Sequence, residues 1–220
     1  MTSVTLEDFM GELKTAAAVM NMRSRMAALP QAGLDLLFDE AHTHYGWDGR
    51  DVTVAELERA LSLASMGPTA FNQQPLRVIF VRSAAAKARL APAMSKGNHD
   101  KTMAAPVTAI ICADLEFWRN LPEVFPAMDA RPFYEGKLDS ARASAQLNGT
   151  LQAGYFLMAL RAVGLDCGPM AGFDKELVAA AFIEGRPWEV RFLINIGHGD
   201  PAKVQPRNPR LGFDRIAEVV

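Results

Sequence analysis

The stretch that decides the fold is Leu147-Asn148-Gly149-Thr150-Leu151-Gln152-Ala153-Gly154-Tyr155-Phe156-Leu157-Met158-Ala159-Leu160. It lies within the longest predicted helix, Arg142 to Val163, which would measure about 33 Å at 1.5 Å per residue. Its apolar side chains surround the helix, and a helix that is apolar on every side is buried on every side. Such a helix lies at the centre of a fold or at a subunit interface. Small residues among the apolar ones would permit close helix approach, so we favour a homodimer over a monomer.

Helices and strands alternate around this helix. Capping-box residues Thr53 and Glu56 open a predicted helix that ends at Ser65, before Pro68. Val107 to Ala113 is apolar throughout, which predicts a strand covered on both faces. Two further strands are predicted at 77–82 and 189–196, and further helices at 8–26, at 34–41 and in the alanine-rich run before Met94; residues 115–137 form an irregular aromatic insertion, and the tail after Arg210 adds a short helix or strand.

Length and composition predict one substantial core. The chain has 220 residues, of which 50% are hydrophobic, and this is typical of a single domain. We assign residues 31–220 to that domain and residues 1–30 to an N-terminal arm of unknown role. The arm packs on a partner subunit or moves in solution, and Met20, Met22 or Met26 is an alternative start of the chain.

Charge and cysteine content exclude several classes of protein. A net charge of -2 and a pI of about 6.1 argue against a nucleic-acid surface, which carries clustered Lys and Arg. No apolar stretch approaches the roughly 18 residues of a membrane span. Acidic residues Glu7, Asp8 and Glu12 argue against a signal peptide. We expect Cys112 and Cys167 to be buried free thiols in a cytoplasmic protein.

Familiar catalytic and nucleotide motifs are absent. The chain has no Gly-x-Gly-x-x-Gly after a strand, no Gly-x-x-x-x-Gly-Lys-Ser/Thr, and no Gly-x-Ser-x-Gly. Its histidines are too scattered for a metal site, and no Cys-x-x-Cys occurs. The segment 164–172 is rich in glycine but contains Pro169. It is therefore no Rossmann loop, yet its glycines allow backbone N–H groups to approach a ligand closely.

Two short segments do indicate a binding site. Gly67-Pro68-Thr69-Ala70-Phe71-Asn72-Gln73-Gln74-Pro75 combines turn formers with side-chain amides. In Gly97-Asn98-His99-Asp100-Lys101, an amide and a lysine stand three residues apart, so both can face one ligand from the start of a helix. Together the segments predict a site for a polar, planar, phosphorylated molecule.

Over residues 34–220 the order and spacing of such segments resemble those of the nitroreductase family of FMN oxidoreductases. Within that family the chain is most similar to the malonic semialdehyde reductases of bacterial pyrimidine utilisation. The matching segments are 41–47 (Ala-His-Thr-His-Tyr-Gly-Trp), 67–69, Asn98 with Lys101, 106–110, 129–131, 164–166, 168–170, 172–174, 194–197 and 209–211.

The resemblance implies an α+β fold with a central sheet flanked by helices and the long central helix at an intertwined dimer interface. Two FMN molecules would bind at that interface, each contacted by both subunits. One subunit would contribute Pro68, Thr69, Asn72 and Gln74. The other would contribute His42, Thr43, His44, Asn98, Lys101, Pro169, Met170, Ala171, Gly172 and Arg210.

These residue types suit FMN. Arg210 and Lys101 can pair with a phosphate dianion, while amides and the backbone at Ala171 and Gly172 can donate to the flavin ring. His42 stands where the family usually has an arginine. His44 and His198 are more typical of hydrogen-bonded structural residues than of ligands.

The resemblance also implies the activity. The chain would oxidise NAD(P)H and reduce a small acceptor, with 3-oxopropanoate to 3-hydroxypropanoate as the favoured reaction. Hydride transfer belongs to the flavin, so we name no catalytic acid or base. In the aromatic insertion, Phe125, Phe133 and Tyr134 form a substrate lid or pack ordinarily, and Arg131 binds a substrate carboxylate. Alternatives are a broad nitro or quinone reductase, and a flavin-binding redox module without useful turnover.

Overall fold

The computed structural model describes residues 6–220, with side chains from residue 14 onward. The chain divides into two compact units, Met1–Ala41 and His42–Val220, which are described separately. The first unit contains helix α1 (Leu6–Arg25), helix α2 (Gln31–Leu34) and a π-helical turn (Asp35–Asp39). The helix predicted at 8–26 corresponds to α1. The helix predicted at 34–41 corresponds to α2 and the π-helical turn, which together begin earlier and end at residue 39. The acidic residues at 7, 8 and 12 lie outside the described side chains, and the predicted boundary at residue 30 stays a prediction.

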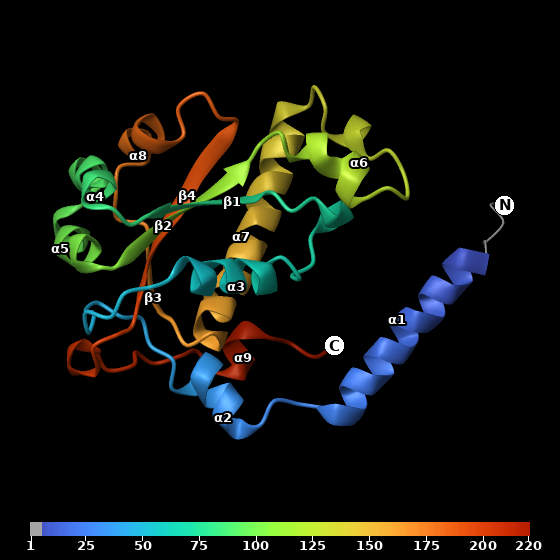
Figure 1. Cartoon of the computed structure of the whole chain (residues 1–220), viewed down its shortest axis with the longest axis horizontal. Coiled ribbons are helices and arrows are strands. Elements are labelled where there is room, and N and C mark those ends of the chain that lie inside the picture. Colours follow the sequence, from blue (N-terminus) through green and yellow to red (C-terminus); the bar gives the residue numbers. More distant parts are fainter. Residues whose placement is uncertain (1–5) are drawn as a thin grey trace. The chain divides into compact units, whose positions relative to one another are not determined.

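The second unit is built on a four-stranded antiparallel sheet with the strand order β1-β2-β4-β3 (Figure 1). Strand β2 lies near the centre and is buried along its whole length, which confirms the prediction for this apolar run. Its Ile110 pairs with Ile79 on one side and with Leu193 on the other. The strands are β1 (Leu76–Val81), β2 (Val107–Asp114), β3 (Asp166–Met170) and β4 (Trp188–Gly197).

Helices cover both faces of the sheet. Helices α3 (Val54–Ala64) and α7 (Leu138–Ala162) bury Leu57, Phe156 and Leu160 against one face. Helices α4 (Ala84–Leu90) and α8 (Lys175–Phe182) bury Leu90 and Val178 against the other face. The remaining helices are α5 (Lys96–Ala104), α6 (Leu121–Val124) and α9 (Phe213–Ile216), with 3₁₀ turns at Ala70–Asn72, Ala91–Ala93, Phe117–Asn120, Arg131–Phe133 and Pro201–Lys203.

The capping box predicted at the start of α3 is confirmed. The Thr53 side chain accepts a hydrogen bond from the backbone N–H of Glu56, and the Glu56 carboxylate accepts one from the backbone N–H of Thr53. Two orphan N–H groups of the first turn are thus satisfied reciprocally.

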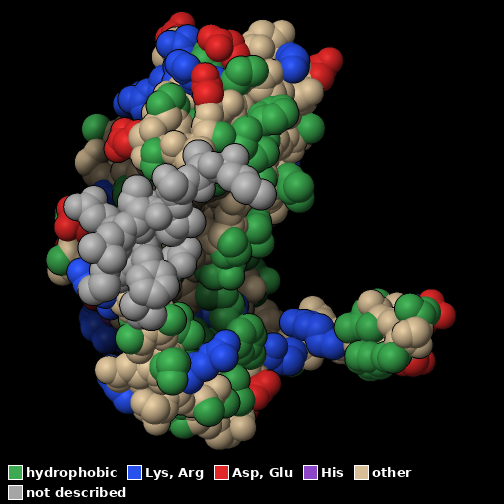
Figure 2. All heavy atoms as spheres, turned by 90° about the vertical axis from the view of Figure 1, so that its right-hand side faces the viewer, with side chains coloured by type: hydrophobic (Ala, Val, Ile, Leu, Met, Phe, Trp, Pro, Cys, Tyr) green, Lys and Arg blue, Asp and Glu red, His purple; other side chains and the backbone are tan. Residues whose placement is uncertain are grey.

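Helix α7 is buried on only part of its circumference in the single chain. Leu147 is 72% exposed, Leu138 61%, Leu151 45% and Tyr155 42%. Figure 2, which looks at the side of the molecule on the right in Figure 1, shows hydrophobic side chains gathered there. Burial of this helix on every side therefore stays a prediction, and a partner would have to complete it.

Two elements differ from the sequence-based prediction. The sequence predicts three strands, but the glycine-rich segment contains a fourth, β3. This strand lies at the sheet edge, where Gly168 and Pro169 are tolerated although neither favours a strand. Helix α8 is also unpredicted; Asp174 begins it by accepting hydrogen bonds from the N–H groups of Glu176 and Leu177.

Both cysteines are free and buried, as predicted. Burial raises the pKa of Cys112 to about 12 and that of Cys167 to about 11. In the part of the chain that the structure describes, no helix combines the length and apolarity needed to cross a bilayer.

Candidate functional site

The segment between α3 and β1 adopts an unusual backbone. Phe71 and Asn72 have φ values of 50° and Gln74 has 44°, so three non-glycine residues occupy the left-handed region. Each such residue costs free energy, and the conformation persists only where surrounding structure enforces it. Strain of this kind often accompanies binding sites, and this segment contains four of the predicted FMN contacts.

A row of polar side chains on α7 enforces that conformation. Asn148 Oδ1 accepts from the Ala70 N–H at 2.9 Å, and Gln152 Oε1 accepts from the Leu76 N–H at 3.0 Å. One turn earlier, Ser144 Oγ lies 3.0 Å from Gln73 Nε2. Sequence reasoning missed this row. Its signal is the i, i+4, i+8 spacing of three polar residues, which places them on one face of the helix.

The aromatic insertion packs on the same segment. The Phe71 ring lies 5.5 Å from Phe125, 5.6 Å from Phe133 and 6.4 Å from Tyr134, measured between ring centroids. Asn72 Nδ2 also donates to the backbone carbonyl of residue 124 at 2.8 Å. The structure therefore brings the predicted lid residues together with the 67–75 segment.

Arg131, the predicted carboxylate-binding residue, already holds a carboxylate. Its Nε and Nη2 donate to the two oxygens of Asp129 at 2.9 and 2.8 Å. These hydrogen bonds lower the pKa of Asp129 to about 2, because they favour the charged form. A substrate carboxylate would have to displace or share this partner.

A second group of predicted residues lies where residues 42–44 meet the sheet edge. Thr43 forms a parallel bridge with Cys167, whose carbonyl accepts from the His44 N–H at 3.2 Å. A Cβ atom at Gly168 would lie 2.6 Å from the His44 carbonyl oxygen, so only glycine permits this approach. The glycine-rich segment and the 42–44 segment are thus packed backbone to backbone.

The His44 side chain has a structural environment. Its Nε2 lies 3.2 Å from Asp166 Oδ1, and its ring sits against Gly199, where a Cβ would come within 1.8 Å of Nδ1. Its Nδ1 is buried without a hydrogen-bond partner among the described residues. The ring therefore holds residues 166 and 199 together, which is the role of a structural histidine rather than of a ligand-binding one. His42 is half-buried in the same segment.

Helix α5 meets the loop that follows β3. Asn98 Nδ2 donates to the Gly172 carbonyl at 2.8 Å, and the Ser95 N–H donates to the same oxygen at 3.2 Å. A Cβ at Gly172 would lie 2.5 Å from Asn98 Nδ2. The structure therefore joins Asn98 to the 169–172 segment, although the two are 74 residues apart in sequence.

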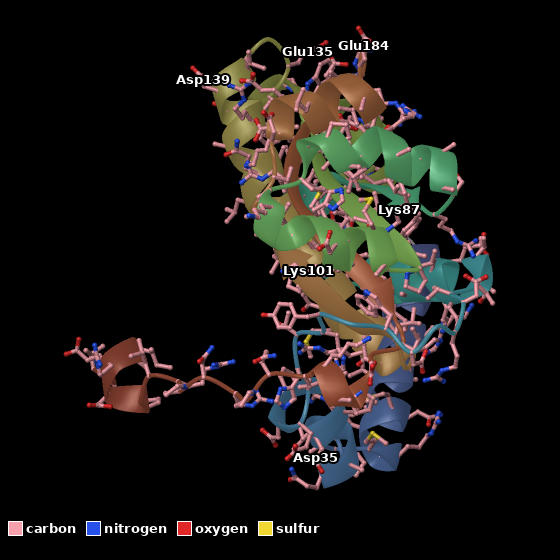
Figure 3. All side chains as sticks on the ribbon, turned by 90° about the vertical axis from the view of Figure 1, so that its left-hand side faces the viewer. Asp35, Lys87, Lys101, Glu135, Asp139 and Glu184 are labelled. Atoms are coloured by element: carbon pink, nitrogen blue, oxygen red, sulfur yellow. The ribbon has the colours of Figure 1, made fainter. Side chains whose placement is uncertain are left out.

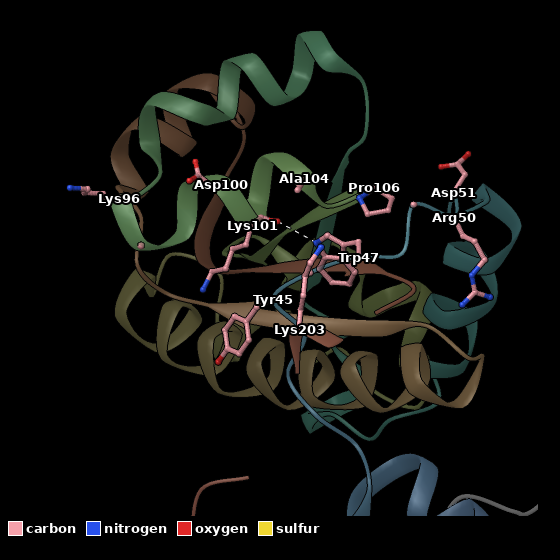
Figure 4. A pocket seen from close by; sticks show the side chains of 13 residues that line it. Tyr45, Trp47, Arg50, Asp51, Lys96, Asp100, Lys101, Ala104, Pro106 and Lys203 are labelled. Atoms are coloured by element: carbon pink, nitrogen blue, oxygen red, sulfur yellow. Dashed lines mark hydrogen bonds between the residues drawn. The ribbon is translucent and has the colours of Figure 1, made fainter. Parts of the chain in front are cut away.

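One turn further along α5, Lys101 lines a cavity of about 710 Å³ (Figure 4). Its ammonium lies 4.8 Å from the centre of the Tyr45 ring, and its backbone carbonyl accepts from Trp47 Nε1 at 3.3 Å. Among the described residues, no carboxylate pairs with Lys101. Burial lowers the pKa of this lysine, so an anionic ligand would stabilise its charged form.

The predicted cofactor residues thus form two groups. The first comprises Pro68, Thr69, Asn72 and Gln74 with the aromatic insertion; the second comprises residues 42–44, α5 and residues 169–172. Figure 1 shows α6, next to the first group, and α5, in the second, on opposite sides of the molecule's second unit. Arg210 belongs to neither: it lies in the exposed tail, where its Nη1 donates to the carbonyl of Asn208 at 2.8 Å. Among the residues described, no cluster of three or more His, Cys, Asp or Glu could hold a metal ion.

Comparisons with known proteins identify the class. A model of the nitroreductase family matches residues 39–198. A protein of Ralstonia nicotianae, provisionally named NADH dehydrogenase/NAD(P)H nitroreductase, is 47% identical over 195 residues, which cover 89% of this chain and 100% of the relative. A similarly named protein of Stutzerimonas stutzeri is 49% identical over 189 residues, which cover 86% of this chain and 96% of that one.

The fold agrees with these matches. The crystal structure of a provisionally assigned nitroreductase from Exiguobacterium sibiricum, in complex with FMN, superimposes with a TM-score of 0.75 at 20% identity, covering 88% of this chain and 98% of the other. The chain belongs to the nitroreductase family, a family of oxidoreductases. Its α+β architecture, with a central sheet flanked by helices, is the one that the sequence predicts.

Proposed function

We propose that this chain binds FMN and uses NAD(P)H to reduce a small acceptor. One observation carries the proposal: Asn98 is fixed to the Gly172 carbonyl, and Lys101, one turn along the same helix, has no carboxylate partner among the described residues. The names of the relatives, which mention NAD(P)H, and the FMN bound in the solved neighbour support it.

The residues fit the cofactor chemically. FMN carries a phosphate dianion, and the Lys101 ammonium is a suitable partner: burial lowers the pKa of this lysine, and a nearby anion would stabilise its charged form. The flavin ring carries carbonyls and ring nitrogens, which backbone N–H groups around Ala171 and Gly172 can satisfy. Arg210 would add a second cation to the phosphate. Bound FMN would supply the hydride chemistry, and the chain's residues would position it and the substrate.

A homodimer accounts for the separation of the two groups. If each FMN is held between subunits, the strained 67–75 segment of one chain faces the 42–44, α5 and 169–172 group of the other. The exposed apolar side of α7, with Leu147 72% and Leu151 45% exposed, supplies a surface for such a contact. The domain assignment of residues 31–220 and the substrate lid at Phe125, Phe133 and Tyr134 belong to this proposal.

The favoured acceptor is 3-oxopropanoate, a small aldehyde with a carboxylate. The Arg131 guanidinium would bind that carboxylate, either together with Asp129 or in place of it. This part of the proposal rests on the resemblance to malonic semialdehyde reductases. The alternative acceptors are nitro compounds and quinones, as the names of the relatives suggest.

The test is an anaerobic titration of the FMN-loaded protein with NADPH, and separately with NADH, followed by visible absorbance. Bleaching of the flavin bands, and their return on addition of 3-oxopropanoate, is the expected result. Return only with a nitroaromatic or a quinone would replace the aldehyde by those acceptors. Failure to bleach would leave a flavin-binding module, and failure to take up FMN would refute the site itself.

A further inference from the structure

A buried lysine lies against α5, one of the elements that form the candidate site. Lys87 of α4 is only 8% exposed. Its ammonium donates to the Thr102 backbone carbonyl at 2.7 Å and to Thr108 Oγ1 at 2.7 Å. Figure 3 labels Lys87 on α4 and Lys101 on the neighbouring α5. Lysine is almost never fully buried without a partner, so its position calls for an explanation.

The lysine belongs to a network that joins five elements. Thr108 Oγ1 on β2 donates to Asn195 Oδ1 on β4 at 2.8 Å, and Asn195 Nδ2 reaches Thr102 Oγ1 on α5 at 3.2 Å. Thr102 Oγ1 in turn contacts Met170 Sδ on β3 at 3.4 Å. Thr102, Thr108 and Asn195 are at most 1% exposed. A buried hydrogen-bond network of this kind fixes the geometry of the elements it joins.

The ammonium is placed at the C-terminal end of α5. Thr102 lies in the last turn of α5, where carbonyls lack intrahelical partners and a positive charge is favourable. Lys87 donates to uncharged groups of α5 and β2, and among the described residues no carboxylate pairs with it to offset the cost of burial. Desolvation accordingly lowers its pKa to about 8. A buried charge without a counter-charge costs stability, which points to a use other than stability.

We propose that Lys87 is a positioning residue for FMN. By holding α5 on the sheet, Lys87 makes Asn98 and Lys101 face the same ligand and keeps Met170 in place on β3. The inference rests on the proposed FMN binding. It assigns to this lysine an effect on FMN affinity that is exerted through α5.

The first test compares Lys87→Met, which keeps the length of the side chain, with Lys175→Met, which removes an exposed lysine from α8. FMN dissociation constants are measured by fluorescence titration of the apoproteins. We expect Kd to rise at least tenfold for Lys87→Met and to stay within twofold of wild type for Lys175→Met. An unchanged Kd in a folded Lys87→Met protein, judged by its circular dichroism, would overturn the proposal.

A double-mutant cycle separates positioning from general destabilisation. If Lys87 acts through α5, Lys87→Met loses most of its effect in an Asn98→Ala/Lys101→Met background, because both α5 side chains proposed to face FMN are already gone. We expect a further rise in Kd of less than threefold there. A full tenfold rise in both backgrounds would show that Lys87 acts independently of the Asn98 and Lys101 side chains and would refute the inference.

Thr108 provides a second route if Lys87→Met does not fold. Thr108→Val removes the hydroxyl that Lys87 contacts and should weaken FMN binding, whereas Thr108→Ser keeps the hydroxyl and should restore it. Equal Kd values for the two variants would contradict the proposal. Wild-type protein that takes up no FMN would refute the proposed function, and the inference with it; wild-type binding with unaffected variants would refute the inference alone.

Discussion

At the scale of single residues, Lys87 links the candidate site to the pH dependence of stability. An unfolded lysine has a pKa of about 10.4, whereas that of Lys87 in the folded chain is about 8. Between these values the unfolded chain binds more protons, so this residue's contribution to stability rises with pH. The rise is at most about 1.4 kcal/mol per pH unit.

The measurement must be a difference between proteins. The raised pKa values of Cys112 and Cys167 act in the opposite direction, because the unfolded thiols lose protons first. Urea unfolding at pH 7.5 and pH 9.5 is therefore compared between wild type and Lys87→Met, in which the thiol effects cancel. We expect wild type to gain stability relative to the variant at the higher pH. A pH-independent difference would mean that Lys87 titrates normally; Lys175→Met serves as the control.

At the scale of elements, α7 clamps the left-handed segment through its polar row. Asn148→Ala removes the acceptor for the Ala70 N–H, and loss of such a bond costs about 1–3 kcal/mol when the donor stays buried. We expect that loss in urea unfolding, together with faster amide hydrogen exchange in residues 69–74. Thr150→Ala, on the exposed side of the same helix, should change neither. Unaltered exchange in Asn148→Ala would show that the segment holds its conformation by itself.

The elements also show what a sequence can and cannot predict here. Helix α3 and strand β2 were predictable because each carries a local signal, a capping box in one case and a continuous apolar run in the other. Strand β3 was not, since Gly168 and Pro169 suppress strand propensity and only pairing with β4 and Thr43 makes it a strand.

The candidate site likewise has some features with a local signal in the sequence and others without one. The sequence analysis places Asn98 and Lys101 at the start of one helix, and both lie in α5. The contact of Asn98 with Gly172 crosses 74 residues, and neither residue carries a local sign of it. The polar row on α7, Ser144, Asn148 and Gln152, was not predicted because apolar residues separate its members in the sequence.

At the scale of the whole molecule, the apolar side of α7 predicts self-association. Leu147→Asp places a charge on this surface, and burying an unpaired charge in an interface is unfavourable. We expect wild type to sediment as a dimer and Leu147→Asp as a monomer, with FMN affinity reduced because each site needs two chains. Leu177→Asp, on α8 and 49% exposed, is the matched control and should remain dimeric. A dimeric Leu147→Asp protein would place the interface elsewhere.

The burial of both cysteines affects how readily their thiols are oxidised in the presence of dioxygen. Reduced flavins react with dioxygen to give hydrogen peroxide, and a protein that carries one is exposed to that oxidant at close range. Peroxide attacks the thiolate, and attack requires access. Cys112 and Cys167 are at most 1% exposed and remain thiols well above neutral pH. Neither presents an accessible sulfur that could become a sulfenic acid, so both thiols of the folded chain would stay reduced in the presence of that peroxide.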